Sequence, residues 1–250
     1  MANKRLAETI MIYIVVWMFW LLYVPVGSFT ASEGVNYATM LVSPLDRLIS
    51  CHAFLYLPYL FEFMFVPIAS ITVVITNYHT PAVEQKLVFT FLIVIGLSYL
   101  IYLLFPANVP MVKKIPSCVY ESGLLNQIIL ESQKWITPWN SFPAMHISTA
   151  WIPFRFFYWK LRYSVPYFIW FVFMCWGAMA SGYHSIADII MGILLVEAVF
   201  FFYNKYEAWF TSLFRPSWYR ARMIFWNVAI VVLGIIIYVS AVKGLFLIKS

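Results

Sequence analysis

Charged residues are scarce in this sequence. Only 10% of its 250 residues are Asp, Glu, Lys or Arg, whereas 64% are hydrophobic and the mean hydropathy is +0.85. Soluble globular domains carry about 25% charged residues. The shortage of charge excludes an ordinary soluble domain, and the sequence predicts an all-α integral membrane protein, because helices satisfy their own backbone hydrogen bonds in lipid.

Cysteines and clustered acidic residues are also few. Cys51, Cys118 and Cys175 are an odd number, lie far apart and lack metal-ligand spacing, so we interpret them as packing residues. No cluster of carboxylates in the sequence indicates a metal site, and we expect neither a metal nor a cofactor. The net charge of +6 comes from basic residues that form no single block, which argues against nucleic acid as a partner.

Long apolar runs, by contrast, are abundant. A helix that crosses a bilayer needs about 20 mostly apolar residues. We predict seven spans, at residues 8–26, 52–77, 87–105, 146–160, 164–183, 185–203 and 223–247. The first lacks a small-residue cleavage pattern, so we interpret it as a true span. The sequence therefore predicts a six-helix core bundle in domain 1–204, and an interfacial segment with a seventh transmembrane helix in 205–250.

The basic residues predict the orientation of these spans. One side receives Lys4, Arg5, Lys86, Arg155, Lys160, Arg162, Lys205, Arg215, Arg220 and Arg222. The other side receives Arg47, Lys113, Lys114, Lys134, Lys243 and Lys249. Because cytoplasmic loops carry the excess of Lys and Arg, we expect a cytoplasmic N-terminus. The opposite side is then periplasmic, extracellular or lumenal.

Two histidines each precede or begin an apolar run, and both fall on that opposite side. One ends the segment Asn140-Ser-Phe-Pro-Ala-Met-His146, and the other begins His184-Ser-Ile-Ala-Asp188. Residues four apart share a helix face, so we expect the Asp188 carboxylate to hold the His184 ring in one tautomer. A buried carboxylate in an apolar helix also needs a partner. The pattern predicts an activated histidine at the membrane surface.

These motifs resemble those of the type-2 phosphatidic acid phosphatase superfamily, in which a Pro-Ser-x-His element precedes a His-x-x-x-Asp element by some forty residues. Here the elements are Pro143-Ala-Met-His146 and His184–Asp188. Ser141-Phe-Pro143, the proline-rich 105–110 and Ser43–Asp46 resemble the branch with inositol-phosphorylceramide synthases and sphingomyelin synthases. The resemblance covers roughly residues 40–200.

The resemblance implies a role for each site residue. His184 attacks phosphorus and forms a phosphohistidine, Asp188 orients it, and His146 protonates the leaving oxygen. Where the family has phosphate ligands, this chain has Ala144, Met111 and Ala178. We predict that other groups hold the phosphate, and these are Lys113, Lys114, Ser141, Asn140 and Ser185.

Other polar residues are interpreted more simply. Glu62 and Glu197 lie inside predicted spans, where a carboxylate is either functional or a neutral packing residue, and we favour packing. The spacing of Leu124–Ile129 indicates an amphipathic helix, either a lid or an interfacial element, of which we favour the second. His52 and His79 receive no role.

The predicted function is a lipid phosphatase or a headgroup phosphotransferase, with a phospholipid or sphingolipid as substrate. The two activities differ only in whether water or a lipid hydroxyl accepts the group from the histidine. One alternative is a catalytically inactive lipid-binding member of the family. Another is a proton-coupled transporter or flippase with a relay of His184, Asp188, Glu62 and Glu197, against which the lack of inverted repeats argues.

Overall fold

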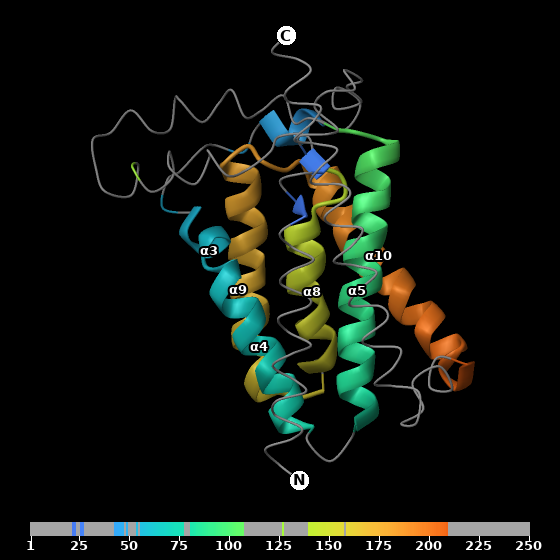
Figure 1. Ribbon diagram of the computed structural model, residues 1–250. Coiled ribbons are helices and arrows are strands. Elements are labelled where there is room, and N and C mark those ends of the chain that lie inside the picture. The colour runs from blue at the N-terminus through green and yellow to red at the C-terminus, as the bar shows by residue number, and fades with distance from the viewer. Residues whose placement is uncertain are drawn as a thin grey trace.

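The computed structural model shows an all-helical bundle in the part of the chain that it describes (Figure 1). The described residues are 22–23, 26–27, 43–47, 49, 54, 56–77, 81–107, 127, 140–157 and 159–209. Its elements are η2 (Pro44–Arg47), α3 (Tyr56–Leu60), α4 (Glu62–Thr76), α5 (Pro81–Leu104), α8 (Met145–Phe157), α9 (Leu161–Ala180) and α10 (Ile186–Lys205). These ranges contain no strand, and only an isolated parallel bridge joins Ala107 to Asn140.

Helix α8 is the centre of the bundle. It contacts α4, α5, α9 and α10, and its first six residues, Met145–Ala150, are all buried. It has 13 residues and is therefore shorter than a membrane span of about 20 residues. Because the other helices surround it, α8 is packed against protein on most of its surface.

The outward faces of the surrounding helices are apolar. Large hydrophobic side chains are exposed along α4, α5, α9 and α10, including Met64 and Ile75 on α4, Leu100 on α5, Ile169 on α9 and Leu194 on α10. Three described helices are long and apolar enough to cross a membrane, at Lys86–Leu104, Leu161–Ala180 and Ile186–Lys205. Helix α4 is apolar but shorter.

The predicted span 52–77 is wrong in one respect, because its described part is two helices and not one. The chain turns at Phe61, between α3 and α4, where ψ is −4°. Met64 N–H donates to the Phe61 carbonyl three residues back, which is the bond of a tightened turn. This break immediately precedes Glu62.

Other parts of the predicted topology lie outside the described residues. The first span, 8–26, is represented only by its last few positions, and the seventh span, 223–247, lies entirely outside. The helix expected at 124–129 is represented by Gln127 alone, and of the C-terminal domain, 205–250, only residues 205–209 are described. The described helices agree with spans 87–105, 146–160, 164–183 and 185–203 to within a few residues, except that α5 begins at Pro81.

Close contact between α8 and α10 depends on Gly192. A Cβ atom at this position would lie 2.8 Å from the Ala144 carbonyl oxygen and 3.1 Å from Ser148 Oγ. The Ser148 hydroxyl in turn donates to the Gly192 carbonyl over 3.0 Å. Small residues allow helix backbones to approach in this way. Gly192 therefore sets the distance between the two helices.

We expect Gly192→Ala to lower the free energy of unfolding by about 1–3 kcal/mol, because the added methyl group meets backbone that cannot move aside. Gly96→Ala is the matched control, since a Cβ at Gly96 in α5 has no neighbour within 4 Å. Thermal unfolding of the purified variants measures both. Equal melting temperatures for the two variants would contradict this account of the contact.

Candidate functional site

The two histidine motifs meet at one end of the bundle, where α8 and α10 begin and α5 and α9 end (Figure 1). His146 lies in the first turn of α8, and His184 lies just before α10. Both imidazoles are buried. The chain thus brings together two segments that the sequence separates by 38 positions.

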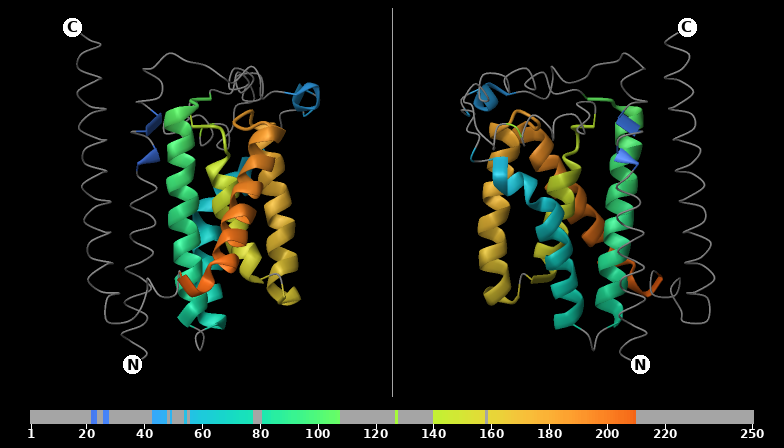
Figure 2. Two further views of the ribbon diagram at one scale, coloured as in Figure 1. Left: turned by 90° about the vertical axis from the view of Figure 1, so that its right-hand side faces the viewer. Right: turned by 60° about the vertical axis from the view of Figure 1, so that its left-hand side comes forward.

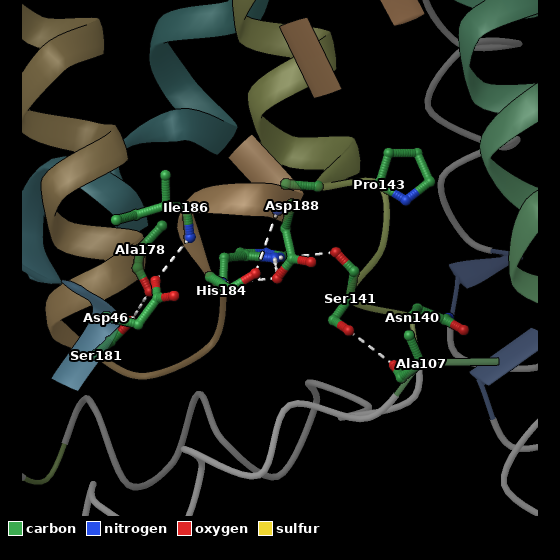
Figure 3. A network of polar contacts seen from close by, with 12 residues as sticks. Asp46, Ala107, Asn140, Ser141, Pro143, Ala178, Ser181, His184, Ile186 and Asp188 are labelled. Atoms are coloured by element: carbon green, nitrogen blue, oxygen red, sulfur yellow. Dashed lines mark hydrogen bonds and ion pairs between the residues drawn. The ribbon is translucent and has the colours of Figure 1, made fainter. Parts of the chain in front are cut away.

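The segment before α8 is held by hydrogen bonds to the end of α5. The Ser141 hydroxyl donates to the Ala107 carbonyl over 2.7 Å, and the Tyr102 hydroxyl donates to the Pro143 carbonyl over 2.7 Å. Asn140 is fully buried and its side-chain amide donates to the Tyr23 carbonyl over 2.7 Å. These bonds fix the backbone carbonyl of Ser141, which faces His184 (Figure 3).

The loop before α10 is fixed by its own backbone. Gly182 has a φ of 75°, a conformation that favours glycine, and it lets the chain reverse after α9. The Ala178 carbonyl then accepts from the amides of Tyr183 and His184. Ala178 therefore positions the His184 loop through its backbone.

A capping box begins α10. The Ser185 hydroxyl accepts from the Asp188 amide over 3.2 Å, and the Asp188 carboxylate accepts from the Ser185 amide over 2.7 Å. This arrangement satisfies amides that an isolated helix end leaves without partners. A second carboxylate, that of Asp46, accepts from the Ile186 amide over 2.8 Å (Figure 3). Two buried carboxylates thus surround the first turn of α10, where the helix dipole favours negative charge.

The nearest acceptor of the His184 ring is a backbone carbonyl. His184 Nδ1 lies 3.2 Å from the Ser141 carbonyl oxygen and 3.7 Å from Asp188 Oδ2. Asp188 therefore lies within ion-pair distance of His184, but the hydrogen bond of the ring is to the Ser141 carbonyl. The difference arises because α10 begins at Ile186, so His184 precedes the helix, and because Asp188 caps it. With Nδ1–H directed at Ser141, Nε2 carries the lone pair.

His146 has a carboxylate partner that the motif does not contain. Its Nδ1 lies 2.6 Å from Oε2 of Glu62, at the start of α4. The other oxygen of this carboxylate, Oε1, accepts from the Thr149 hydroxyl over 3.0 Å, and Glu62 is buried. The packing interpretation of Glu62 is therefore incomplete, because this residue orients His146 as well.

The two imidazoles lie close to each other. Their ring centroids are 6.0 Å apart, and the ring of Tyr59 lies 5.1 Å from His146 and 6.4 Å from His184. Tyr183 stacks on Tyr59 with centroids 6.0 Å apart, and Tyr56 contacts both. An aromatic wall of Tyr56, Tyr59 and Tyr183 therefore borders the pair of histidines.

The structure describes only some of the residues that we predict to bind phosphate. Lys113 and Lys114 lie outside the described residues, as does Met111. Ala144 is buried, and its amide donates to the Asp188 carbonyl over 3.1 Å. Asn140, Ser141 and Ser185 are at the site, but their contacts described above are with backbone groups, so phosphate binding by these side chains stays a prediction.

Glu197, the second intramembrane carboxylate of the prediction, belongs to another cluster. It accepts from Trp151 Nε1 over 2.7 Å and pairs with Arg155 Nε over 2.9 Å, further along α8. Within the described ranges, no group of three or more His, Cys, Asp or Glu residues is placed to hold a metal ion. The candidate site consists of two imidazoles, the three carboxylates of Asp46, Glu62 and Asp188, and a tyrosine wall.

Comparison of the chain with models of protein families, with curated proteins and with solved structures found no match in any of the three.

Removal of the Glu62 carboxylate should destabilise the protein. Glu62→Ala leaves His146 Nδ1 and the Thr149 hydroxyl without this buried acceptor, and we expect a loss of about 1–3 kcal/mol in the free energy of unfolding. Glu62→Gln keeps the shape and one carbonyl acceptor, so its loss should be smaller. Chemical denaturation of the two variants tests this order, and a Glu62→Ala protein as stable as the wild type would refute the described contacts.

Proposed function

We propose that this protein is an integral membrane enzyme that cleaves a lipid phosphate ester through a covalent phosphohistidine on His184. Its product is either a hydrolysed lipid or a lipid with a transferred headgroup. The observation that carries the proposal is the pair of imidazoles 6.0 Å apart, each with Nδ1 at an acceptor. Two imidazoles this close can act on one phosphoryl group, one as the nucleophile and the other as the acid.

A membrane location is supported by the exterior of the bundle. Exposed apolar side chains extend over α4, α5, α9 and α10, and three of the described helices have the length and composition of membrane spans. Soluble monomers rarely expose apolar patches of this extent. The charge bias of the sequence supports a cytoplasmic N-terminus and a site on the periplasmic, extracellular or lumenal side.

In the first step, His184 acts as the nucleophile. Nε2 bonds to phosphorus while the bond from phosphorus to the lipid oxygen breaks. The His146 imidazolium gives its Nε2 proton to that leaving oxygen, which departs as an alcohol. The Ser141 carbonyl supports this role because it accepts the Nδ1 proton of His184 over 3.2 Å.

In the second step, His146 acts as a base. It takes the proton of an acceptor hydroxyl, from water or from a second lipid, while the acceptor oxygen bonds to phosphorus and the phosphorus–nitrogen bond breaks. Both imidazoles return to their starting state. Hydrolysis and transfer therefore use the same residues.

The carboxylates support the charges that form in these steps. Glu62 lies 2.6 Å from His146 Nδ1 and stabilises the imidazolium that donates the proton. Asp188, 3.7 Å from His184 Nδ1, stabilises the positive phosphohistidine ring. The negative oxygens on phosphorus lie near the N-terminal end of α8, whose dipole favours anions. We propose Lys113 and Lys114 as further phosphate ligands.

The transporter alternative gains little support from the contacts. A proton relay through Glu62 and Glu197 needs a chain of groups between them, but Glu62 contacts His146 and Thr149 whereas Glu197 contacts Trp151 and Arg155. An inactive lipid-binding protein has no need for two oriented imidazoles. The geometry favours the enzyme.

Substitution of the two histidines should have different effects with different leaving groups. We expect His184→Ala to abolish turnover of every phosphate ester, because the nucleophile is lost. His146→Ala should slow cleavage of an alkyl ester by about 10²–10⁴, the contribution of general acid catalysis. With a nitrophenyl ester, whose leaving group needs no proton, His146→Ala should form the phosphohistidine at close to the wild-type rate and release a burst of nitrophenol. The second step, in which His146 is the base, should stay slow. Rapid-mixing and steady-state assays of purified protein measure these two rates separately.

The control is His79→Ala, which removes a histidine to which we assign no role. Mass spectrometry of protein trapped with substrate should locate the phosphoryl group on His184. Full activity of folded His184→Ala protein would eliminate the proposed mechanism. Analysis of the product then distinguishes hydrolysis, which releases phosphate or a phosphorylated headgroup, from transfer, which forms a new phosphodiester lipid.

A further inference from the structure

An apolar groove of about 630 Å³ opens on the side of the bundle between α9 and α10. The two helices diverge from the loop that joins them, and α8 lies between them (Figures 1 and 2). The lining includes Trp151 of α8, Phe168, Val172 and Met179 of α9, and Ile193 of α10. None of the residues that line the groove is charged, so its walls match a hydrocarbon chain.

The groove begins close to the site. Met179 lies five residues before His184, Trp151 lies five after His146, and Ile193 lies five after Asp188. A fourth lining residue, Ile49, follows the carboxylate of Asp46, which holds the start of α10. On α8 and α10 the site residue and the wall of the groove are therefore about 7.5 Å apart at 1.5 Å per residue, and Met179 lies at the end of α9 that leads to His184.

The length of the groove corresponds to one leaflet. Along α9 the lining extends from Phe168 to Met179, which is about 16 Å at 1.5 Å per residue. The hydrocarbon core of a bilayer is about 30 Å thick, so each leaflet contributes about 15 Å. Because Met179 is at the site end of α9, the groove extends from the site into the same leaflet.

We infer that this groove holds one acyl chain of the lipid whose phosphate lies between His146 and His184. The inference depends on the proposed function for the identity of the headgroup, but the occupant is identified by the groove itself. Its walls are apolar, and it opens on the outer surface of the bundle. Its length matches an acyl chain that extends through one leaflet. The chain anchors the substrate and directs its phosphate toward the histidines.

A bulky side chain in the groove should weaken binding of long-chain substrates. Val172 lines the groove and is 46% exposed, and Ile169 is 52% exposed on the same helix but is not part of the lining. We expect Val172→Trp to raise KM for a long-chain lipid by about tenfold, because several methylene groups lose their burial. The kcat value, and the KM of a soluble nitrophenyl ester, should stay unchanged. Ile169→Trp should leave all of these parameters as in the wild type.

A second measurement does not require turnover. A phospholipid with a diazirine in the middle of one acyl chain is photolysed with the protein in vesicles, and the labelled peptides are identified by mass spectrometry. We expect labelling concentrated at the groove residues of α9 and α10, reduced by Val172→Trp and by excess unlabelled lipid but not by Ile169→Trp. His184→Ala should retain the label.

The outcomes separate the two proposals. If labelling is spread evenly over the outward faces and unlabelled lipid does not compete, the label reports ordinary contact with the bilayer. That result would overturn the proposal that the groove holds an acyl chain. Equal KM changes for Val172→Trp and Ile169→Trp overturn it as well. Specific labelling of a protein that turns over no phosphate ester supports the groove and contradicts the enzyme.

Discussion

The arrangement of the site depends on the close approach of the first turns of α8 and α10. The Ala144 amide donates to the Asp188 carbonyl over 3.1 Å, and the absence of a side chain at Gly192 makes room for the Ala144 carbonyl. This contact joins the two histidine motifs, which are 38 positions apart in the sequence. The positions of His146, His184 and their acceptors follow from it, because each lies within a few residues of the two helix starts.

The buried carboxylates near the site differ in the groups that they contact. Asp46 and Asp188 both accept backbone amides at the start of α10, so their charges are balanced by the positive end of a helix. Glu62 lies in the first turn of α4, where the helix dipole also favours negative charge, but its carboxylate contacts side chains, an imidazole and a hydroxyl. A buried carboxylate is costly without such partners. Its presence in the interior is therefore coupled to the orientation of His146, and the stability of the core and the state of the site depend on the same group.

Much of this site could be predicted from local sequence patterns. The two histidines, Asp188 and the membrane-like helices follow from spacing and hydropathy. The exact partner of His184 could not be predicted, because the helix begins two residues later and its capping box uses Asp188. Glu62 was recognised as a carboxylate in an apolar run, but its partner is 84 positions away, and a single sequence contains no signal for such a contact. Similarly, the turn at Phe61 lies within a continuous apolar run, so hydropathy alone does not reveal it.

The shortness of α8 has a consequence for the lipid environment. Its 13 residues measure about 20 Å, whereas the hydrocarbon core is about 30 Å thick. With His146 near the headgroup plane of one leaflet, as the proposed function requires, the far end of α8 stops about 10 Å short of the opposite plane. The bilayer beside the bundle is then thinned, or headgroups follow the basic residues after α8 inward. Hydrophobic mismatch of this kind makes the host membrane itself a determinant of access, so the same chain encounters its substrates differently in thin and thick bilayers.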